Sequence, residues 1–407
     1  MPRVSPDLGT GRASLGLVFD HAWEGGEFTA SDAMAVTGLT RSTTIDAIDT
    51  LVEAGMLREL PNARDVGQYR AGRPARRFAL PADLGCVAGI DAGDTHVSVT
   101  LTDLSGGVLS RRRIDVDPLD TPDRRRETII AHLRTALTEA DVEPERLLAV
   151  CAGVAAPVAR DGTSPPHPEG FWERTNPGLV TALAAESAVV RIENDALLAA
   201  AAEGQQGAAI GCRDYIALLA GERLGSGVVI DGHPLHGAHG GVGEMYAFDI
   251  VRGVDSAFGL GPSIVALTRE LIASGDVDPA GALGGIAADD ADARDVLAAA
   301  AAGDPDALRV AESVGDALAR IVGVLGSMFD PKRIVVCGAI ADGIDPVLDA
   351  ARRVLPQLTH LPAPELVRSE LGSDIVSAGA VVEALRAARE VAVPQLAEQR
   401  LRGVLVR

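Results

Sequence analysis

The chain has 407 residues, too many for one ordinary hydrophobic core, which predicts two or three domains. Hydrophobic residues make up 47% and charged residues 23%, which excludes a disordered or collagen-like chain. The net charge of −20 would argue against nucleic acid only if it were evenly spread. No apolar run reaches the roughly 20 residues of a membrane span and no signal-peptide core follows Met1, so we expect a cytoplasmic protein with no membrane partner.

The first 55 residues predict three helices. Apolar residues recur at helical spacing over 13–23, Thr29 can cap a short helix over 29–36, and Gly38 allows a tight turn. Thr40 can then cap a longer helix. The inward-facing apolar residues of that helix are Ile45, Ile48, Leu51 and Val52. Helix, turn and helix therefore follow one another closely.

A hairpin is predicted after the third helix. Gly55 ends the helix, Met56-Leu57 read as the first residues of a strand, and Phe78-Ala79-Leu80 read as the returning strand. Residues 1–85 carry nine Arg against eleven Asp and Glu, a net −2, which leaves −18 for residues 86–407. Within 58–77, however, six Arg face only two acidic residues. The hairpin is therefore a basic island in an acidic protein.

These residues resemble the winged helix-turn-helix domains of bacterial regulators, in the stretches 38–44 and 51–57. The exposed start of the third helix presents short hydroxyls and a guanidinium suited to phosphates and base edges, and Gly72-Arg73-Pro74 resembles a minor-groove hook. The expected DNA-binding residues are Thr40, Arg41, Ser42, Thr43, Thr44, Arg73 and Arg76. Three alternatives stay open: a protein-docking module, ordinary helix capping, and a solvated charged loop.

Two apolar strands flank a short turn at 91–95, where Asp91, Gly93 and Thr95 offer backbone N–H groups, a hydroxyl and a carboxylate. Such a turn can hold a phosphate and a metal-bound water, although many hairpins contain Asp and Gly. Further motifs follow in order along the chain. They are Cys151–Val158, Ile192-Glu193-Asn194-Asp195-Ala196, Leu224-Gly225-Ser226-Gly227, Gly240–Glu244 and Ile334–Ala339.

This ordered series resembles the ROK family of sugar kinases and sugar-responsive repressors, from about residue 86 to 390. The resemblance implies an α/β fold: a two-lobed actin-like (ribonuclease-H-like) sugar-kinase domain over 86–390, preceded by a winged helix-turn-helix over 10–82. It implies sugar binding by Asn194, Asp195 and Glu244, with Asp195 at the position of the catalytic base. It also implies nucleotide-like loops at Asp91, Gly93, Thr95, Gly225, Ser226, Gly227 and Gly338.

Two departures from the family weaken the prediction of catalysis. Asp94 stands where kinases carry a second Gly, and a carboxylate opposes a polyphosphate. The family's zinc loop, which follows the Gly-Glu pair and is rich in Cys, is missing because no Cys lies between Cys212 and Cys337. His233, His236 and His239 read as solvated loop residues, and the cysteines, Cys86 and Cys151 included, as core thiols. We therefore expect no metal and no cofactor.

The sequence thus favours a sugar-responsive regulator, a repressor with operator DNA as partner, acting as a homodimer or dimer of dimers and lacking kinase activity. Asp195 read alone could equally be a helix N-cap, and Glu244 a surface residue. One rival is an active ATP-dependent sugar kinase with an appended DNA-binding domain. The other is a regulator with a degenerate cleft whose signal is a protein partner.

Overall fold

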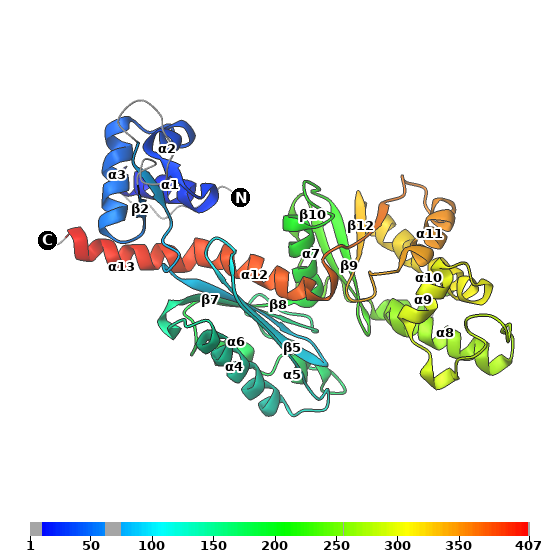
Figure 1. Ribbon diagram of the computed structural model, residues 1–407. Coiled ribbons are helices and arrows are strands. Elements are labelled where there is room, and N and C mark those ends of the chain that lie inside the picture. Colours follow the sequence, from blue (N-terminus) through cyan, green and yellow to red (C-terminus); the bar gives the residue numbers. More distant parts are fainter. Residues whose placement is uncertain (1–9, 62–74, 255, 406–407) are drawn as a thin grey trace.

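The computed structural model describes residues 10–61, 75–254 and 256–405. Its N-terminal unit contains three helices and a small antiparallel sheet in the order β1-β3-β2 (Figure 1). The elements are α1 (Thr10–Gly25), β1 (Phe28–Thr29), α2 (Ala30–Thr37), α3 (Arg41–Glu53), β2 (Arg58–Leu60) and β3 (Arg77–Ala79). The three expected helices are therefore present. The strand expected at Met56 begins two residues later, because the backbone N–H groups of Met56 and Leu57 both donate to the Leu51 carbonyl of α3.

Capping explains the helix boundaries of this unit. The Thr29 side chain and Asp32 form a reciprocal capping box at the start of α2. Gly38 ends α2 with a φ of 70°, a left-handed conformation that glycine adopts without a steric penalty. Thr40 caps α3 by accepting a hydrogen bond from the Thr43 backbone N–H. The turn between the two helices is therefore set by local chemistry that the sequence displays.

The rest of the described chain forms two lobes, each built on a five-stranded sheet. The first sheet has the order β6-β5-β4-β7-β8 and the second the order β11-β10-β9-β12-β13. In each, three antiparallel strands are followed by two parallel ones. This repetition is the duplicated architecture expected of an actin-like fold. The strands are β4 (Cys86–Ala92), β5 (His96–Asp103), β6 (Val108–Asp115), β7 (Leu147–Val154), β8 (Val190–Asn194), β9 (Tyr215–Ala220), β10 (Leu224–Ile230), β11 (His233–Pro234), β12 (Arg333–Cys337) and β13 (Glu365–Arg368).

Helices cover both sheets (Figure 1). Those of the first lobe are α4 (Pro122–Glu139), α5 (Phe171–Thr175) and α6 (Leu179–Leu183), and those of the second are α8 (Leu260–Ser274), α9 (Ala293–Ala301), α10 (Pro305–Phe329) and α11 (Asp345–Val354). Two more, α7 (Asp195–Gln206) and α12 (Ile375–Ala387), pack on each other, and α12 lies mainly against strands β4 and β7 of the first sheet while α7 lies mainly against β9 and β10 of the second. Two glycines allow this close packing, because a Cβ on Gly379 would overlap the Leu198 backbone and one on Gly89 would press on Val381.

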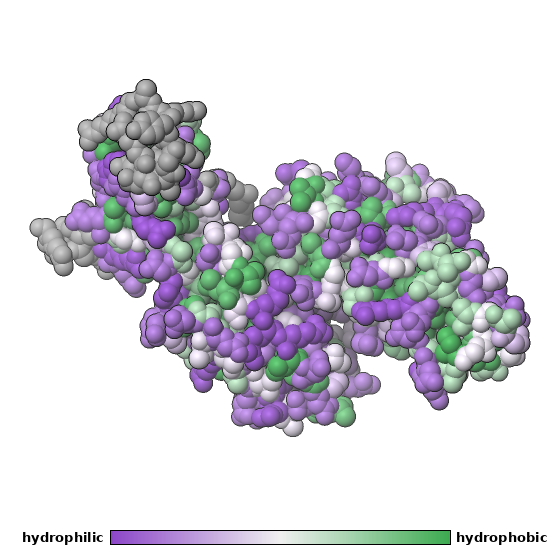
Figure 2. Space-filling model, viewed as in Figure 1, coloured by the Kyte–Doolittle hydropathy of each residue, from purple (hydrophilic) through white to green (hydrophobic). Residues whose placement is uncertain are grey.

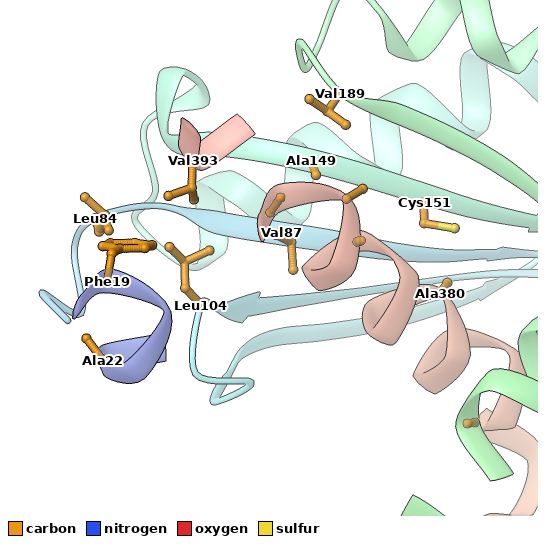
Figure 3. Close-up of a cluster of buried hydrophobic side chains, with 14 of the residues drawn as sticks. Phe19, Ala22, Leu84, Val87, Leu104, Ala149, Cys151, Val189, Ala380 and Val393 are labelled. Carbon is orange, nitrogen blue, oxygen red and sulfur yellow. The ribbon is translucent and has the colours of Figure 1, made fainter. Parts of the chain in front are cut away.

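The C-terminal helix links the first lobe to the N-terminal unit. After α12 the chain continues through a π-helical turn (Ala388–Ala392) into α13 (Val393–Leu405), which runs beside the N-terminal unit (Figure 1). A shared core contains Phe19 of α1, Leu84 and Leu104 of the first lobe, and Val393 (Figure 3). The helix α13 itself contacts the N-terminal unit, because Arg400 donates to the carbonyl of Gly55 at 2.9 Å.

The cysteines behave as core thiols: Cys86, Cys151 and Cys337 are buried and free, and Cys212 is half-buried and free. Across the described ranges, no helix combines the length and apolarity that crossing a membrane would require.

Candidate functional site

A cleft of about 1010 Å³ lies between the two lobes, and its hollow is visible in Figure 2. Strand ends from both sheets supply its walls, because Asp91 lies near the end of β4, Asn194 ends β8, and Gly338 follows β12. Ligands of α/β folds bind outside the carboxyl ends of parallel strands, where side chains from several strands converge. The predicted site residues that line this cleft are Asp91, Gly93, Thr95, Asn194, Asp195, Gly225, Glu244 and Gly338.

Asn194 serves as the N-cap of α7. Its Oδ1 accepts hydrogen bonds from the backbone N–H groups of Ala196 (2.9 Å) and Leu197 (3.2 Å), and its Nδ2 donates to the Ala156 carbonyl (3.1 Å). Asp195 is the first residue of α7 and not its cap, and one of its oxygens accepts from Ala196 N–H at 2.8 Å. The capping alternative considered for Asp195 therefore applies to its neighbour.

The inner part of the cleft is acidic. Burial, together with the nearby charges of Asp91 and Glu244, raises the pKa of Asp195 to about 7. Burial also raises the pKa of Glu244, opposed by the positive charge of Arg223. A carboxyl group with a pKa near 7 is partly protonated at neutral pH, so it can donate as well as accept a hydrogen bond. These carboxyl groups are suited to sugar hydroxyls and poorly suited to a phosphate.

The turn after β4 is occupied by side chains of the protein itself. Nε2 of His96 lies 2.9 Å from Oδ2 of Asp91. The guanidinium of Arg125, only 1% exposed, donates to the carbonyls of Gly93 and Asp94. Asp94 lines the cleft beside them. The turn is thus held by the Arg125 side chain, and Asp94 adds a carboxylate to the wall of the cleft.

The second predicted phosphate loop is only partly in the cleft. Gly225 lines it, but Ser226 is fully buried and its hydroxyl donates to the Gly243 carbonyl at 3.3 Å. Gly227 packs so tightly on the Ala196 backbone that a Cβ there would overlap it. Contrary to the prediction of a loop at the cleft, neither Ser226 nor Gly227 lines it. The motif lies within strand β10, where successive side chains alternate between the two faces.

Aromatic side chains at the cleft were missed by the sequence analysis. His167, Phe171 and Trp172 from the first lobe and Tyr246 from the second line the cleft. The ring centroids of Trp172 and Tyr246 lie 6.3 Å apart. Scarcity was a usable signal, because the chain has only two Trp and three Tyr. Their meeting could not be foreseen, since 74 positions separate Trp172 from Tyr246.

The residues after Glu244 do not fit a zinc ion. Among the described side chains, no three His, Cys, Asp or Glu come together as a metal-binding group. The expectation that the loop histidines are simply solvated is wrong for His236, whose Nε2 lies 2.9 Å from Oε2 of Glu193. That hydrogen bond raises the pKa of His236. His236 is therefore tied to the first lobe by an acidic partner.

At the start of α3, Arg41 and Ser42 are exposed and Thr43 is half-buried. Oγ1 of Thr40 lies 2.9 Å from Oγ1 of Thr43 and 3.2 Å from Oγ of Ser42. Thr44 is fully buried, and its hydroxyl donates to the Thr40 carbonyl at 2.9 Å. Its prediction as a DNA contact is therefore wrong, because one helical turn places its side chain on the core face.

Arg76, at the base of the hairpin, is engaged within the protein. Its guanidinium donates to both carboxylate oxygens of Glu59 (2.8 and 3.0 Å) and to Asp49 of α3 (2.8 Å), and it lies 5.0 Å from the Phe78 ring centroid. These ion pairs raise the pKa of Arg76. Arg76 therefore ties the hairpin to α3. Arg73 and the rest of the hairpin tip lie outside the described residues.

The chain belongs to the ROK family, whose model matches residues 87–382. A solved structure of a ROK family transcriptional regulator, described as a homologue of the E. coli Mlc protein, superposes with a TM-score of 0.74 and 20% identity over 95% of this chain and 99% of that one. At that identity the likeness concerns the fold. It spans the N-terminal unit together with both lobes.

Curated relatives include both repressors and kinases. The xylose repressor of Bacillus subtilis (strain 168) is 26% identical over 211 residues, which cover 52% of this chain and about half (53%) of the repressor. The glucokinase of Streptomyces coelicolor is 28% identical over 330 residues, which cover 73% of this chain and 96% of the glucokinase. The relatives alone therefore leave regulator and kinase both open, and the residues of the site have to decide between them.

Proposed function

We propose that this protein is a sugar-responsive transcriptional regulator, a repressor, that binds operator DNA through a winged helix-turn-helix over residues 10–82 and senses a sugar in the interlobe cleft. One observation carries the proposal: the cleft keeps the carboxyl groups of Asp195 and Glu244, while the adjoining phosphate turn carries Asp94 and has Asp91 paired with His96. The sugar half of a kinase site is preserved, and its phosphate half is altered. Phosphoryl transfer needs metal, phosphate cradle and base together.

The N-terminal unit supports the DNA-binding part of the proposal. The capped start of α3 presents Arg41 and Ser42 to solvent, a guanidinium and a hydroxyl that match phosphates and base edges in a major groove. A repressor of this kind acts as a homodimer or dimer of dimers, so that its operator is an inverted repeat with half-sites about one or two helical turns apart.

The rival function, sugar phosphorylation, is favoured by a specific observation. Asp195 lies in the cleft with a pKa raised to about 7 by burial, which suits a general base. However, a base alone does not make an active site, because it needs a substrate held beside a bound nucleotide. We therefore infer that Asp195 now binds a sugar hydroxyl and no longer activates one for transfer.

Selection from random DNA, combined with sugar titration, tests the proposal. The purified chain should enrich an inverted repeat, Arg41→Ala should weaken binding to the enriched DNA, and stereoisomers of the bound sugar should bind at least about tenfold more weakly. Asp195→Ala and Glu244→Ala should each lower the affinity for the sugar while leaving the enriched DNA motif unchanged. Sugar-dependent ADP formation at about 1–100 per second, abolished by Asp195→Asn, would overturn the proposal in favour of the kinase.

A further inference from the structure

A cluster of rings joins the two lobes at the cleft. His167 and Trp172 belong to the first lobe, with centroids 4.8 Å apart, and Tyr246 belongs to the second. The Tyr246 centroid lies 6.3 Å from that of Trp172 at an interplanar angle of 71°, and 6.4 Å from that of His167 at 38°. These distances are those at which aromatic pairs attract each other in edge-to-face and tilted arrangements. The contact therefore resists separation of the lobes.

Tyr246 is also anchored within its own lobe. The guanidinium carbon of Arg223 lies 4.5 Å from the Tyr246 ring centroid and 5.7 Å from that of Phe258. Nη2 of Arg223 lies 3.2 Å from Oδ2 of Asp249, on the same short helix as Tyr246 (Tyr246–Ile250). Contacts from both lobes thus set the position of this ring, although it is 39% exposed.

The ring stands two residues after Glu244, one of the carboxyl groups of the cleft. The backbone of Glu244 forms an isolated antiparallel bridge with Gly225 of β10. Burial and the negative charge of Glu244 raise the pKa of Tyr246, opposed by the positive charge of Arg223. The segment 244–246 is therefore held by β10 on one side and by the ring cluster on the other.

We propose that His167, Trp172 and Tyr246 form an interlobe clasp in which Tyr246 is a positioning residue for Glu244 and limits how far the cleft opens. This inference rests on the proposed function, because it assigns a role in sugar sensing to the same cleft. A regulator must couple its ligand to a change between two conformations, and a contact that bridges the lobes is one that such a change must make or break. The clasp orders this segment by packing.

Tryptophan fluorescence tests the clasp without any ligand. The chain has two tryptophans, so a Trp23→Phe background leaves Trp172 as the only indole. In that background Tyr246→Ala should raise acrylamide quenching of Trp172 about twofold, because the ring that covers it is lost. Tyr246→Phe keeps the ring, so acrylamide should quench Trp172 in this variant to the same extent as in the parent. Ile250→Ala is the matched control: it removes another large side chain, 87% exposed, from the same short helix.

Sugar affinity is measured next on the same variants, with circular dichroism melting to show that each is folded. Tyr246→Ala should lower the affinity for the sugar by about tenfold. Tyr246→Phe should bind the sugar to within about twofold of the parent, since positioning depends on the ring and not on the hydroxyl. Unchanged quenching in a folded Tyr246→Ala protein, or failure of Tyr246→Phe to restore affinity, would overturn the clasp. If no sugar binds even the parent while the quenching changes as expected, the proposed function fails and the clasp stands.

Discussion

At the scale of single residues, the surroundings of Asp195 change its pKa. Burial and the charge of Asp91 raise its pKa to about 7, against 3.8 for the unperturbed side chain. A raised carboxyl pKa means that the folded protein binds this proton more tightly than the unfolded chain does. Stability is therefore highest below the unfolded value and is lost as pH rises from about 4 to 7.

Asp195→Asn should remove this loss, because the amide stays neutral and its oxygen can still accept from Ala196 N–H. Without sugar, the free energy of unfolding of the variant minus that of the parent should increase by on the order of 1 kcal/mol from pH 5.5 to pH 8. This is less than the full pKa shift implies, because Asp195 lines a cleft open to water. Calorimetric melting across that pH range measures it. Glu244→Gln, at the second carboxyl group with a pKa raised by burial, should show the same sign. A gain that does not vary with pH would contradict this account.

At the scale of elements, the hairpin and α3 are connected through Arg76. Its ion pairs with Glu59 of β2 and Asp49 of α3 offset the charge of the guanidinium, so we expect Arg76 to position the hairpin rather than to contact a phosphate. Arg41, by contrast, is exposed at the start of α3, where a phosphate can reach it. The two arginines were predicted alike from the sequence, and their surroundings give them different roles.

The salt dependence of operator affinity separates these roles. Arg41→Ala should lower the slope of log affinity against log salt by about one, as expected when one phosphate contact is lost. Arg76→Ala should weaken binding with little change in slope. Glu59→Gln is the decisive control: it should weaken binding if Arg76 positions the hairpin, and strengthen it if Arg76 contacts phosphate. The second result would refute the positioning role.

At the scale of the whole molecule, one helical path runs from the cleft to the N-terminal unit. Ile375 and Val376 at the start of α12 line the cleft, and α12 continues through the π-helical turn into α13. Arg389 in that turn pairs with Asp20 (3.3 Å) and Glu24 (2.8 Å) of α1. Further along, Arg400 donates to the carbonyl of Gly55, two residues after the end of α3, at 2.9 Å. A helix held at both ends can transmit lobe movement to the DNA-binding unit.

Arg389→Ala should therefore reduce the coupling between sugar and operator. Coupling is reciprocal and typically about 5–150-fold, and exposed ion pairs of this kind are worth up to about 1 kcal/mol, so we expect the coupling factor to fall about two- to fivefold while sugar affinity without DNA stays nearly constant. Titration calorimetry with and without operator measures the factor. Arg386→Ala, one turn earlier, is the control because its ion pair with Glu383 stays within α12. Equal losses in both variants would show that Arg389 has no special part.

The sequence by itself determined those features that depend on local chemistry, namely helix boundaries and short motifs. Helix α3 follows from the cap at Thr40 and from apolar residues spaced along one face, and the turn before it from a glycine at Gly38. The acidic cleft residues Asp195 and Glu244 were found through motifs, because each motif is a short continuous stretch of the chain. Such features depend on neighbours within a few residues, which a sequence shows directly.

Tertiary structure alone decided the rest. Whether a polar residue faces the cleft or the core depends on strand and helix faces, which placed Ser226 and Thr44 inside against expectation. The partners of Arg76 and the meeting of Trp172 with Tyr246 join residues from different elements. Contacts of this kind form only when whole elements pack, and the packing is set by many weak interactions summed over both lobes rather than by any motif.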